Sequence, residues 1–201
     1  MRLKYMRQAV SMLVKEWNLG KNECGASGNI CGWIYLMEIL EESEKLVFYK
    51  EKGKLIGFCG YSKYDSKKYL FRKKFFCFIK KLLMKNRKIK DKNALNEYYN
   101  NYEYTPNELK GYFDGEISIL IVNSDYRGKG IGKKLLIDIF EKAKLDSMNN
   151  IKILSDESCS YSFYEKLGCK KVYETIIENY EYGKVGVASS EIGYIYEKNL
   201  K

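Results

Sequence analysis

Arg127-Gly128-Lys129-Gly130-Ile131-Gly132 separates two stretches of different hydrophobic pattern. Residues 117–122, Ile-Ser-Ile-Leu-Ile-Val, are apolar except for Ser118, which predicts a mostly buried strand. After the glycines, apolar side chains recur at helical spacing with lysines and acids between them, which predicts an amphipathic helix. These apolar residues are Ile131, Leu135, Leu136, Ile139, Phe140 and Ala143. The hexapeptide is therefore interpreted as the loop between a strand and a helix.

Such a loop suits a diphosphate, because backbone N–H groups and the positive end of the helix dipole point to one place. Arg127 adds a positive charge. The glycines alternate at positions 128, 130 and 132, so neither the P-loop pattern nor the dinucleotide spacing Gly-x-Gly-x-x-Gly is present. A glycine turn that only joins a strand to a helix is the alternative.

A second segment, Phe163-Tyr164-Glu165-Lys166-Leu167-Gly168-Cys169, predicts the end of a short helix closed by Gly168, followed by a strand at residues 170–173. Together the two segments resemble the GNAT superfamily of acetyl-CoA-dependent N-acetyltransferases. The first matches that family's Arg/Gln-x-x-Gly-x-Gly/Ala signature, and the second matches its Phe-Tyr-Glu-Lys-x-Gly signature. The resemblance is specific for residues 116–173, with a predicted strand at residues 151–154 between the two motifs.

The resemblance implies an α+β (mixed α/β) GNAT fold, with a central, mostly antiparallel, twisted sheet flanked by helices. The hydrophobic pattern predicts helices over residues 5–17 and 33–40 and a hairpin of residues 46–49 and 55–61. The family's first strand would have to lie in residues 1–4. Where the family has a tight hairpin, residues 62–106 predict a helical insertion between the third and fourth strands.

The insertion carries most of the positive charge of the chain. Between residues 62 and 92 there are 13 Lys or Arg against two Asp, a net +11 in a chain of net +10. Residues 70–85 predict a basic amphipathic helix, and four tyrosines precede Pro106. The apolar residues of the helix are Phe71, Phe75, Phe78, Ile79 and Leu82, and the tyrosines are Tyr98, Tyr99, Tyr102 and Tyr104. We expect a lid whose apolar stripe packs on the domain, with an anionic membrane surface or an acidic partner as the less favoured alternative.

The whole chain, residues 1–201, fits a single domain, and its apolar runs are too short to span a bilayer. The N-terminus lacks the apolar core of a signal peptide, so we expect a cytoplasmic protein.

The six cysteines form no Cys-x-x-Cys pair and there is no histidine, which predicts reduced thiols and no metal site. The lack of histidine also excludes Ser-His-Asp and Cys-His hydrolases. Because the basic charge is confined to one segment, no nucleic-acid partner is expected.

By resemblance, acetyl-CoA is the co-substrate, and the backbone of Leu120, Ile121 and Val122 pairs with its pantetheine arm. The diphosphate would be held by Arg127, Gly128, Lys129, Gly130, Ile131, Gly132 and Lys133. Tyr164 matches the family's tyrosine that protonates the departing thiolate. A phenol with a pKa of about 10 is a weaker acid than a thiol of about 8.5, so this role requires a pocket that shifts one of them. The alternative is that Tyr164 positions the sulfur or packs in the core.

For the base, Glu116 at the start of the strand is the best placed carboxylate, with Asp114 or a chain of water molecules as alternatives. Glu157 and Ser160 stand where the family commonly has an asparagine and an alanine, so the contact of that asparagine to the cofactor is not carried over. Cys159 is interpreted as a small buried residue rather than a nucleophile.

We therefore expect transfer of an acetyl group from acetyl-CoA to a primary amine of a small molecule or peptide, by direct attack in a ternary complex. Polyamines, aminoglycoside-like antibiotics, small amino compounds and protein amines are the candidate acceptors. The alternative is a GNAT-fold acyl-CoA-binding or membrane-docking module without turnover. A nucleotide-phosphate enzyme is a distant third, since no Ser or Thr for magnesium follows a P-loop lysine.

Overall fold

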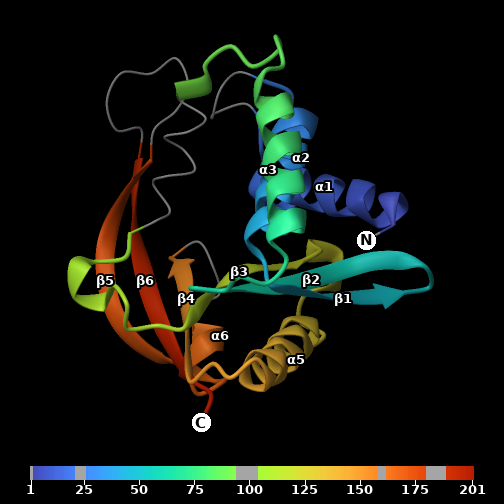
Figure 1. Ribbon diagram of the computed structural model, residues 1–201. Coiled ribbons are helices and arrows are strands. Elements are labelled where there is room, and N and C mark those ends of the chain that lie inside the picture. The colour runs from blue at the N-terminus through green and yellow to red at the C-terminus, as the bar shows by residue number, and fades with distance from the viewer. Residues whose placement is uncertain (1, 21–25, 94–103, 158–161, 180–188) are drawn as a thin grey trace.

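The chain folds around one six-stranded sheet flanked by helices, as a computed structural model shows (Figure 1). The structure describes residues 2–20, 26–93, 104–157, 162–179 and 189–201. The strands are β1 (Lys45–Glu51), β2 (Lys54–Lys63), β3 (Gly115–Val122), β4 (Asn150–Asp156), β5 (Lys170–Asn179) and β6 (Ser189–Asn199). Their order in the sheet is β1-β2-β3-β4-β6-β5, and every neighbouring pair is antiparallel except β3 and β4. The predicted mixed α/β architecture with a mostly antiparallel sheet is confirmed.

Helices cover both faces of the part of the sheet formed by β1 to β3 (Figure 1). On one side lie α1 (Leu3–Trp17) and α2 (Gly28–Glu42), with α3 (Leu70–Met84) against α2, and on the other lies α5 (Ile131–Leu145). The four-residue helix α6 (Ser162–Glu165) precedes β5. Two hydrophobic clusters result, one between α1, α2 and the sheet and one between α5 and the opposite face.

The prediction of a first strand within residues 1–4 is wrong, because Leu3 begins α1. Apolar residues recur at helical spacing from there on, and Ala9 and Leu13 are fully buried against α2 and the sheet. The insertion therefore leaves β2 and returns into β3, which are the second and third strands of this sheet. The hairpin of β1 and β2 confirms the prediction for residues 46–61.

Strand β6 was not predicted, although it lies between β4 and β5. Its Tyr194, Ile195 and Tyr196 are buried, so both faces of the strand are covered at this point, and the charged Glu197 and Lys198 follow. The alternation of Ile192, Tyr194 and Tyr196 is the pattern that could have revealed it.

Strand β3 contains a β-bulge at Ser118. Gly60 of β2 lies opposite Ile119, but the next residue, Tyr61, lies opposite Ile117. Ile119 and Ile121 consequently pack on the side of α1 and α2, whereas Ile117 packs on the side of α5. A bulge changes which face a side chain occupies, so the simple alternation read from the sequence is interrupted here.

The sheet opens between its two parallel strands. β3 and β4 are paired at one position, Glu116 opposite Lys152, near the start of both strands. Beyond that point the two strands diverge, and β4, β6 and β5 turn away from β1 to β3 (Figure 1). A strand edge without a partner offers backbone groups to an extended ligand. The end of β3, which leads into the glycine loop, lies on this open side.

The insertion extends over both parts of the sheet. The predicted helix of residues 70–85 is confirmed as α3, but the expectation that its apolar stripe packs on the domain is wrong for four of five residues. Ile79 contacts the core, whereas Phe71, Phe75, Phe78 and Leu82 are exposed. Tyr104, near the end of the insertion, donates a hydrogen bond to the Ser155 carbonyl at 2.7 Å in β4. Tyr98, Tyr99 and Tyr102 belong to the part of the chain that the structure does not describe.

Four cysteines, Cys31, Cys59, Cys77 and Cys169, are free thiols. Burial raises the pKa of Cys169 to about 11, so this thiol is a poor nucleophile at neutral pH. Cys24 and Cys159 fall outside the described residues.

Within the described ranges, no helix combines the length and the hydrophobicity that crossing a bilayer requires.

Candidate active site

The glycine loop leaves the start of α5 open. Gly128 and Gly130 have φ angles of 76° and 72°, which glycine adopts without strain, and a Cβ at either position would have no atom of the described residues within 4 Å. Gly130 is the N-cap residue of α5, no side chain caps the helix, and its first turn contains no acid. The first N–H groups of a helix lack partners within the helix and carry its positive dipole end. This exposed helix start therefore fits an anion such as a diphosphate.

Arg127, which the sequence predicts to bind the diphosphate, contacts other parts of the protein. Arg127 Nη2 forms an ion pair with Glu16 Oε2 of α1 at 2.6 Å, and its Nε donates to the Val122 carbonyl at 3.2 Å. Glu16 also accepts a hydrogen bond from Ser124 N at 3.0 Å. Arg127 therefore fastens the loop to α1, and its charge is already partly neutralised.

The other residues predicted to bind the diphosphate differ in whether they can contribute a charged side chain or a backbone N–H group. Lys129 and Lys133 are exposed, and the ammonium of Lys129 lies 4.9 Å from the ring centre of Tyr126. The side chain of Ile131 is buried in the core, so its backbone N–H is the part that faces the loop opening. A Cβ at Gly132 would lie 3.6 Å from Cζ of Phe163, which is ordinary contact.

This short distance from Gly132 to Phe163 shows that the two sequence motifs lie side by side. Phe163 and Tyr164 belong to α6, and their ring centres are 5.4 Å apart. Tyr164 is 8% exposed and also contacts Tyr196 of β6, with ring centres 5.6 Å apart. The predicted helix end is confirmed: Gly168 has a φ of 71° and its N–H donates to the Glu165 carbonyl. The ring of Tyr164 thus packs among aromatic rings, in the same cluster as Ile131 at the start of α5.

Strand β3 joins the same cluster. Leu120 and Val122 are partly buried and pack against the core that contains Tyr164. Ile121 points to the opposite face and is buried with α1 and α2, so it can offer only its backbone to the open side. The end of β3, the loop and α6 therefore border one region of the open sheet.

Glu116 lies where β3 and β4 meet, and it is held by an ion pair. Its Oε2 lies 2.6 Å from Lys152 Nζ and accepts a hydrogen bond from the Tyr64 hydroxyl at 2.9 Å. The side chain of Lys152 is 3% exposed and also donates to Thr105 Oγ1 at 2.7 Å. Tyr64 and Thr105 come from the two ends of the insertion, so the insertion closes over this ion pair.

Sequence reasoning missed Lys152, Tyr64 and Thr105. A signal for Lys152 was present, because one lysine interrupts the apolar run Ile151-Lys152-Ile153-Leu154, and a charge in a buried strand needs a partner. Tyr64 and Thr105 carried no signal, since they are 41 positions apart and only the fold brings both to Lys152.

Asp114, the alternative base, has a structural role. Its Oδ2 accepts hydrogen bonds from the backbone N–H groups of Asn149 and Asn150, at 2.5 and 3.4 Å. Its own N–H donates to Asn150 Oδ1 at 3.0 Å. Asp114 therefore fixes the start of β4 beside β3, which leaves Glu116 as the better candidate.

Glu42, at the end of α2, is a further carboxyl group whose pKa is shifted upward. Although the residue keeps exposed surface, loss of hydration around its carboxyl, together with the charges of Glu38 and Glu116, raises its pKa to about 7. Nothing in the sequence distinguished it from the other acids of residues 38–44.

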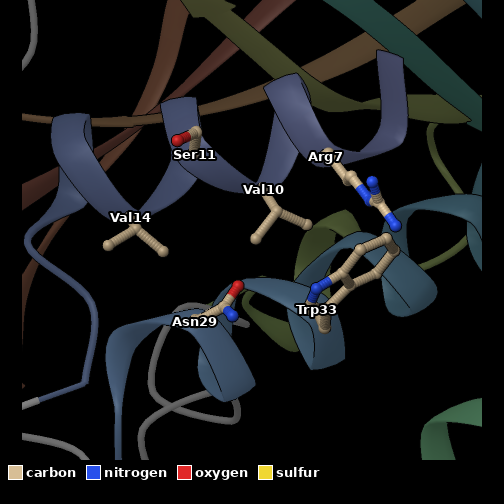
Figure 2. A pocket seen from close by; sticks show the side chains of 6 residues that line it. All are labelled: Arg7, Val10, Ser11, Val14, Asn29 and Trp33. Atoms are coloured by element: carbon tan, nitrogen blue, oxygen red, sulfur yellow. The ribbon is translucent and has the colours of Figure 1, made fainter. Parts of the chain in front are cut away.

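The hollow in Figure 2 is separate from this region. It lies between α1 and α2 and is lined by Arg7, Val10, Ser11, Val14, Asn29 and Trp33. None of the motif residues borders it.

Among the described residues, no group of His, Cys, Asp or Glu could hold a metal ion. Cys159 and Ser160, near the second motif, are not described.

Known proteins resemble this chain in sequence pattern and in fold. A family model described as "Acetyltransferase (GNAT) domain" matches residues 41–170, well over half of the chain. Among solved structures, a protein from Streptococcus mutans is similar with a TM-score of 0.58 and 17% identity, over 100% of this chain and 97% of that one. An aminoglycoside 6'-N-acetyltransferase complexed with coenzyme A has a TM-score of 0.58 and 15% identity, over 100% and 93%. An aminoglycoside 6'-acetyltransferase type Ii has a TM-score of 0.55 and 18% identity, over 98% and 91%. No curated protein matches the chain.

Proposed function

The chain belongs to the GNAT acetyltransferase family, and from this premise we propose that it transfers an acetyl group from acetyl-CoA to a primary amine by direct attack in a ternary complex. One observation carries the proposal: a Cβ on Gly132 would lie 3.6 Å from Phe163, so the open start of α5 lies beside α6, the helix that carries the buried Tyr164. A site for a diphosphate and a candidate acid are thus adjacent, at the side where β3 and β4 diverge.

Binding of acetyl-CoA would use backbone groups more than side chains. The N–H groups of residues 128–133 would hold the diphosphate, with Lys129 and Lys133 adding positive charge. The pantetheine arm would run along Leu120, Ile121 and Val122, whose strand edge on the side of β4 pairs with no strand in the part of the chain that the structure describes. One N–H of these three residues would stabilise the oxyanion that forms when the acetyl carbonyl is attacked.

In the transfer step the amine nitrogen attacks the acetyl carbonyl carbon, a C–N bond forms, and the C–S bond of the thioester breaks. The departing thiolate takes the phenolic proton of Tyr164. The transfer leaves a phenolate in place of the thiolate, so burial alone does not favour it, and the site must stabilise the phenolate more than the thiolate. Solvent then returns a proton to Tyr164 and takes the one held by Glu116.

Glu116 would remove the proton from the amine, directly or through a water molecule. Its ion pair with Lys152 keeps the carboxylate in one orientation, and Oε2 is the atom that contacts both Lys152 Nζ and the Tyr64 hydroxyl.

The acceptor is proposed at the level of a primary amine. Two proteins of similar fold are named aminoglycoside acetyltransferases, so aminoglycosides are the first amines to try. Polyamines, small amino compounds and peptide amines complete the panel.

The binding step is tested by the melting temperature with and without acetyl-CoA, because a ligand that binds the folded state stabilises it. We expect a clear increase for the wild type and for Gly111→Val, and none for Gly130→Val. Gly111 is the matched control, since it also has a positive φ, of 79°, and open space around a Cβ, but lies outside the loop. An equal increase in both variants would contradict the assignment of the loop.

The transfer step is tested by release of free thiol with the amine panel. We expect release that depends on one class of amine and that Glu116→Gln lowers. If acetyl-CoA binds and every amine leaves thiol release at background, the chain is a binding module without turnover.

A further inference from the structure

Helix α3 presents two different apolar faces. Phe76, Ile79, Leu83 and Met84 pack against the cluster of α1, α2 and the sheet. Another line of large side chains, Phe71, Phe75, Phe78 and Leu82, remains exposed, with exposed fractions of 87%, 52%, 59% and 48%. These four residues are spaced by four, three and four positions, so they form one straight ridge along the helix, which we call the α3 ridge. Figure 1 shows α3 at the outside of the helix layer, against α2.

The lysines of α3 are divided in the same way. On the packed side, Lys80 Nζ lies 2.8 Å from Glu41 and 3.6 Å from Glu38, and Lys73 lies 3.8 Å from Glu44. The acids of α2 and of the residues after it therefore neutralise this side.

Beside the α3 ridge the lysines remain unneutralised. Lys74, Lys81 and Lys85 are exposed, and each follows a ridge residue by three positions, which places all three along one flank. None of them forms an ion pair with any residue in the described part of the chain. The helix itself contains no acid, and more exposed basic residues follow it at positions 87, 88, 90 and 92.

From these two observations we propose that the α3 ridge docks the protein on an anionic lipid surface. Large apolar side chains beside lysines are the arrangement by which a helix lies in the headgroup region of a membrane, with the apolar side inserted and the cations at the phosphates. A second copy of the chain fits less well, because pairing two ridges would bring the unneutralised lysines of both copies together. A ridge also fits a soft, flat surface better than it fits a peptide, which usually binds in a groove.

The proposal does not depend on acetyl transfer. It concerns a helix on the side of the sheet opposite α5, and its failure would leave the assignment of the glycine loop unaffected. Conversely, an inactive chain could still bind membranes through α3.

The experiment is co-sedimentation of the full chain with vesicles of phosphatidylcholine alone or mixed with phosphatidylglycerol. We expect binding to the mixed vesicles at low salt and its loss as salt rises, because surface attraction is screened over about 10 Å at 0.1 M. Phe78→Glu should lower the partition at least about tenfold, since it removes inserted apolar surface and adds repulsion. Ile137→Glu is the matched control, because Ile137 is 45% exposed on α5, and should bind as the wild type does.

A double variant, Lys74→Glu with Lys81→Glu, tests the contribution of charge and should weaken binding and flatten its dependence on salt. Melting curves establish that each variant is folded. Failure of the wild type to sediment, equal binding to both kinds of vesicle, or unchanged binding of Phe78→Glu would overturn the proposal. So would a dimer in solution that Phe78→Glu dissociates, because the ridge would then be an interface between two copies.

Discussion

Helices α3 and α5 are alike in sequence and differ in what they bury. Each has 15 residues, and each combines apolar residues at helical spacing with several lysines. Helix α5 buries six residues, Ile131, Leu135, Leu136, Ile139, Phe140 and Ala143, whereas no residue of α3 is fully buried. An amphipathic pattern therefore predicts a helix, but the size of the surface opposite it decides how much becomes core.

The difference has a geometric cause. Helix α5 lies directly on the sheet, whose broad face accepts a wide apolar stripe. Helix α3 packs against another helix, α2, and contact between two cylinders is narrow. The charges follow the same division, because α5 carries Asp138 and Glu141 among its lysines and α3 carries no acid.

The largest effect is expected from shortening a core residue of α5. Leu136→Ala should lower the free energy of unfolding by about 2–5 kcal/mol, because Leu136 is fully buried and the substitution leaves a cavity. The matched change in α3, Phe78→Ala, should alter it by less than about 0.5 kcal/mol. Urea unfolding measures both. Similar losses in the two variants would mean that the α3 ridge is buried in solution.

Next in size is the effect of removing the phenolic hydroxyl beside α5. Tyr164→Phe should lower kcat about 10²-fold, the usual contribution of a general acid, and leave the affinity for acetyl-CoA nearly unchanged. Tyr196→Phe is the control, because its ring contacts Tyr164 but it has no role in the proposed transfer. A wild-type rate in Tyr164→Phe would show that Tyr164 contributes packing and no proton.

A smaller effect should separate the two sides of α3. Lys80→Ala should cost about 1–2 kcal/mol of stability, because it leaves Glu38 and Glu41 half-buried without their cation, whereas Lys81→Ala should cost almost nothing.

The loss in Lys80→Ala should also depend on pH. The pKa of Glu42 is raised to about 7 by loss of hydration and by neighbouring acids, against the charge of Lys80. A raised carboxyl pKa means that the folded state binds the proton more tightly, so stability falls as pH rises from about 4.5 toward 7. Removing Lys80 strengthens that trend, and unfolding at pH 5 and pH 8 should show the larger deficit at pH 8. A loss of stability that is the same at both pH values would show that Lys80 does not influence the ionisation of Glu42.

The smallest effect concerns Asp146, which links the end of α5 to the segment before α3. Its carboxylate accepts from the Tyr61 hydroxyl at 2.6 Å and forms ion pairs with Lys45 and Lys68. Burial opposes ionisation, but these partners outweigh it and lower the pKa of Asp146 to about 2.

The stabilisation by Asp146 is therefore present above about pH 4 and is lost as pH falls through 2. Asp146→Asn should cost about 1 kcal/mol near pH 6 and less at pH 2. Melting temperatures of the variant and the wild type at the two values measure this difference, and Asp138→Asn, at an exposed i,i+4 pair, is the control. An equal loss at both values would show that the ion pairs contribute nothing.

Local pattern was sufficient for much of the fold. The helices at α1, α3 and α5, the hairpin of β1 and β2, and the turn at Gly168 follow from hydrophobic spacing and glycine position, which are properties of adjacent residues. The first strand in residues 1–4 was wrong because a family expectation outweighed helical spacing that continues to Leu3. Strand β6 was missed although Ile192, Tyr194 and Tyr196 alternate.

The two motifs by themselves determined the family, the glycine loop and the candidacy of Tyr164, because each motif depends on residues that are close in the sequence. The resemblance to the family then made Glu116, at the start of the strand, the candidate base. Only the tertiary structure decided that Glu116 pairs with Lys152 under Tyr64 and Thr105, that Arg127 turns to Glu16, and that the Asp114 carboxylate accepts hydrogen bonds from backbone N–H groups. It also decided which apolar face of α3 is covered. The physical reason is the same in each case: these contacts join residues far apart in the chain, and their energies depend on burial and distance, which exist only once the sheet and its helices have assembled.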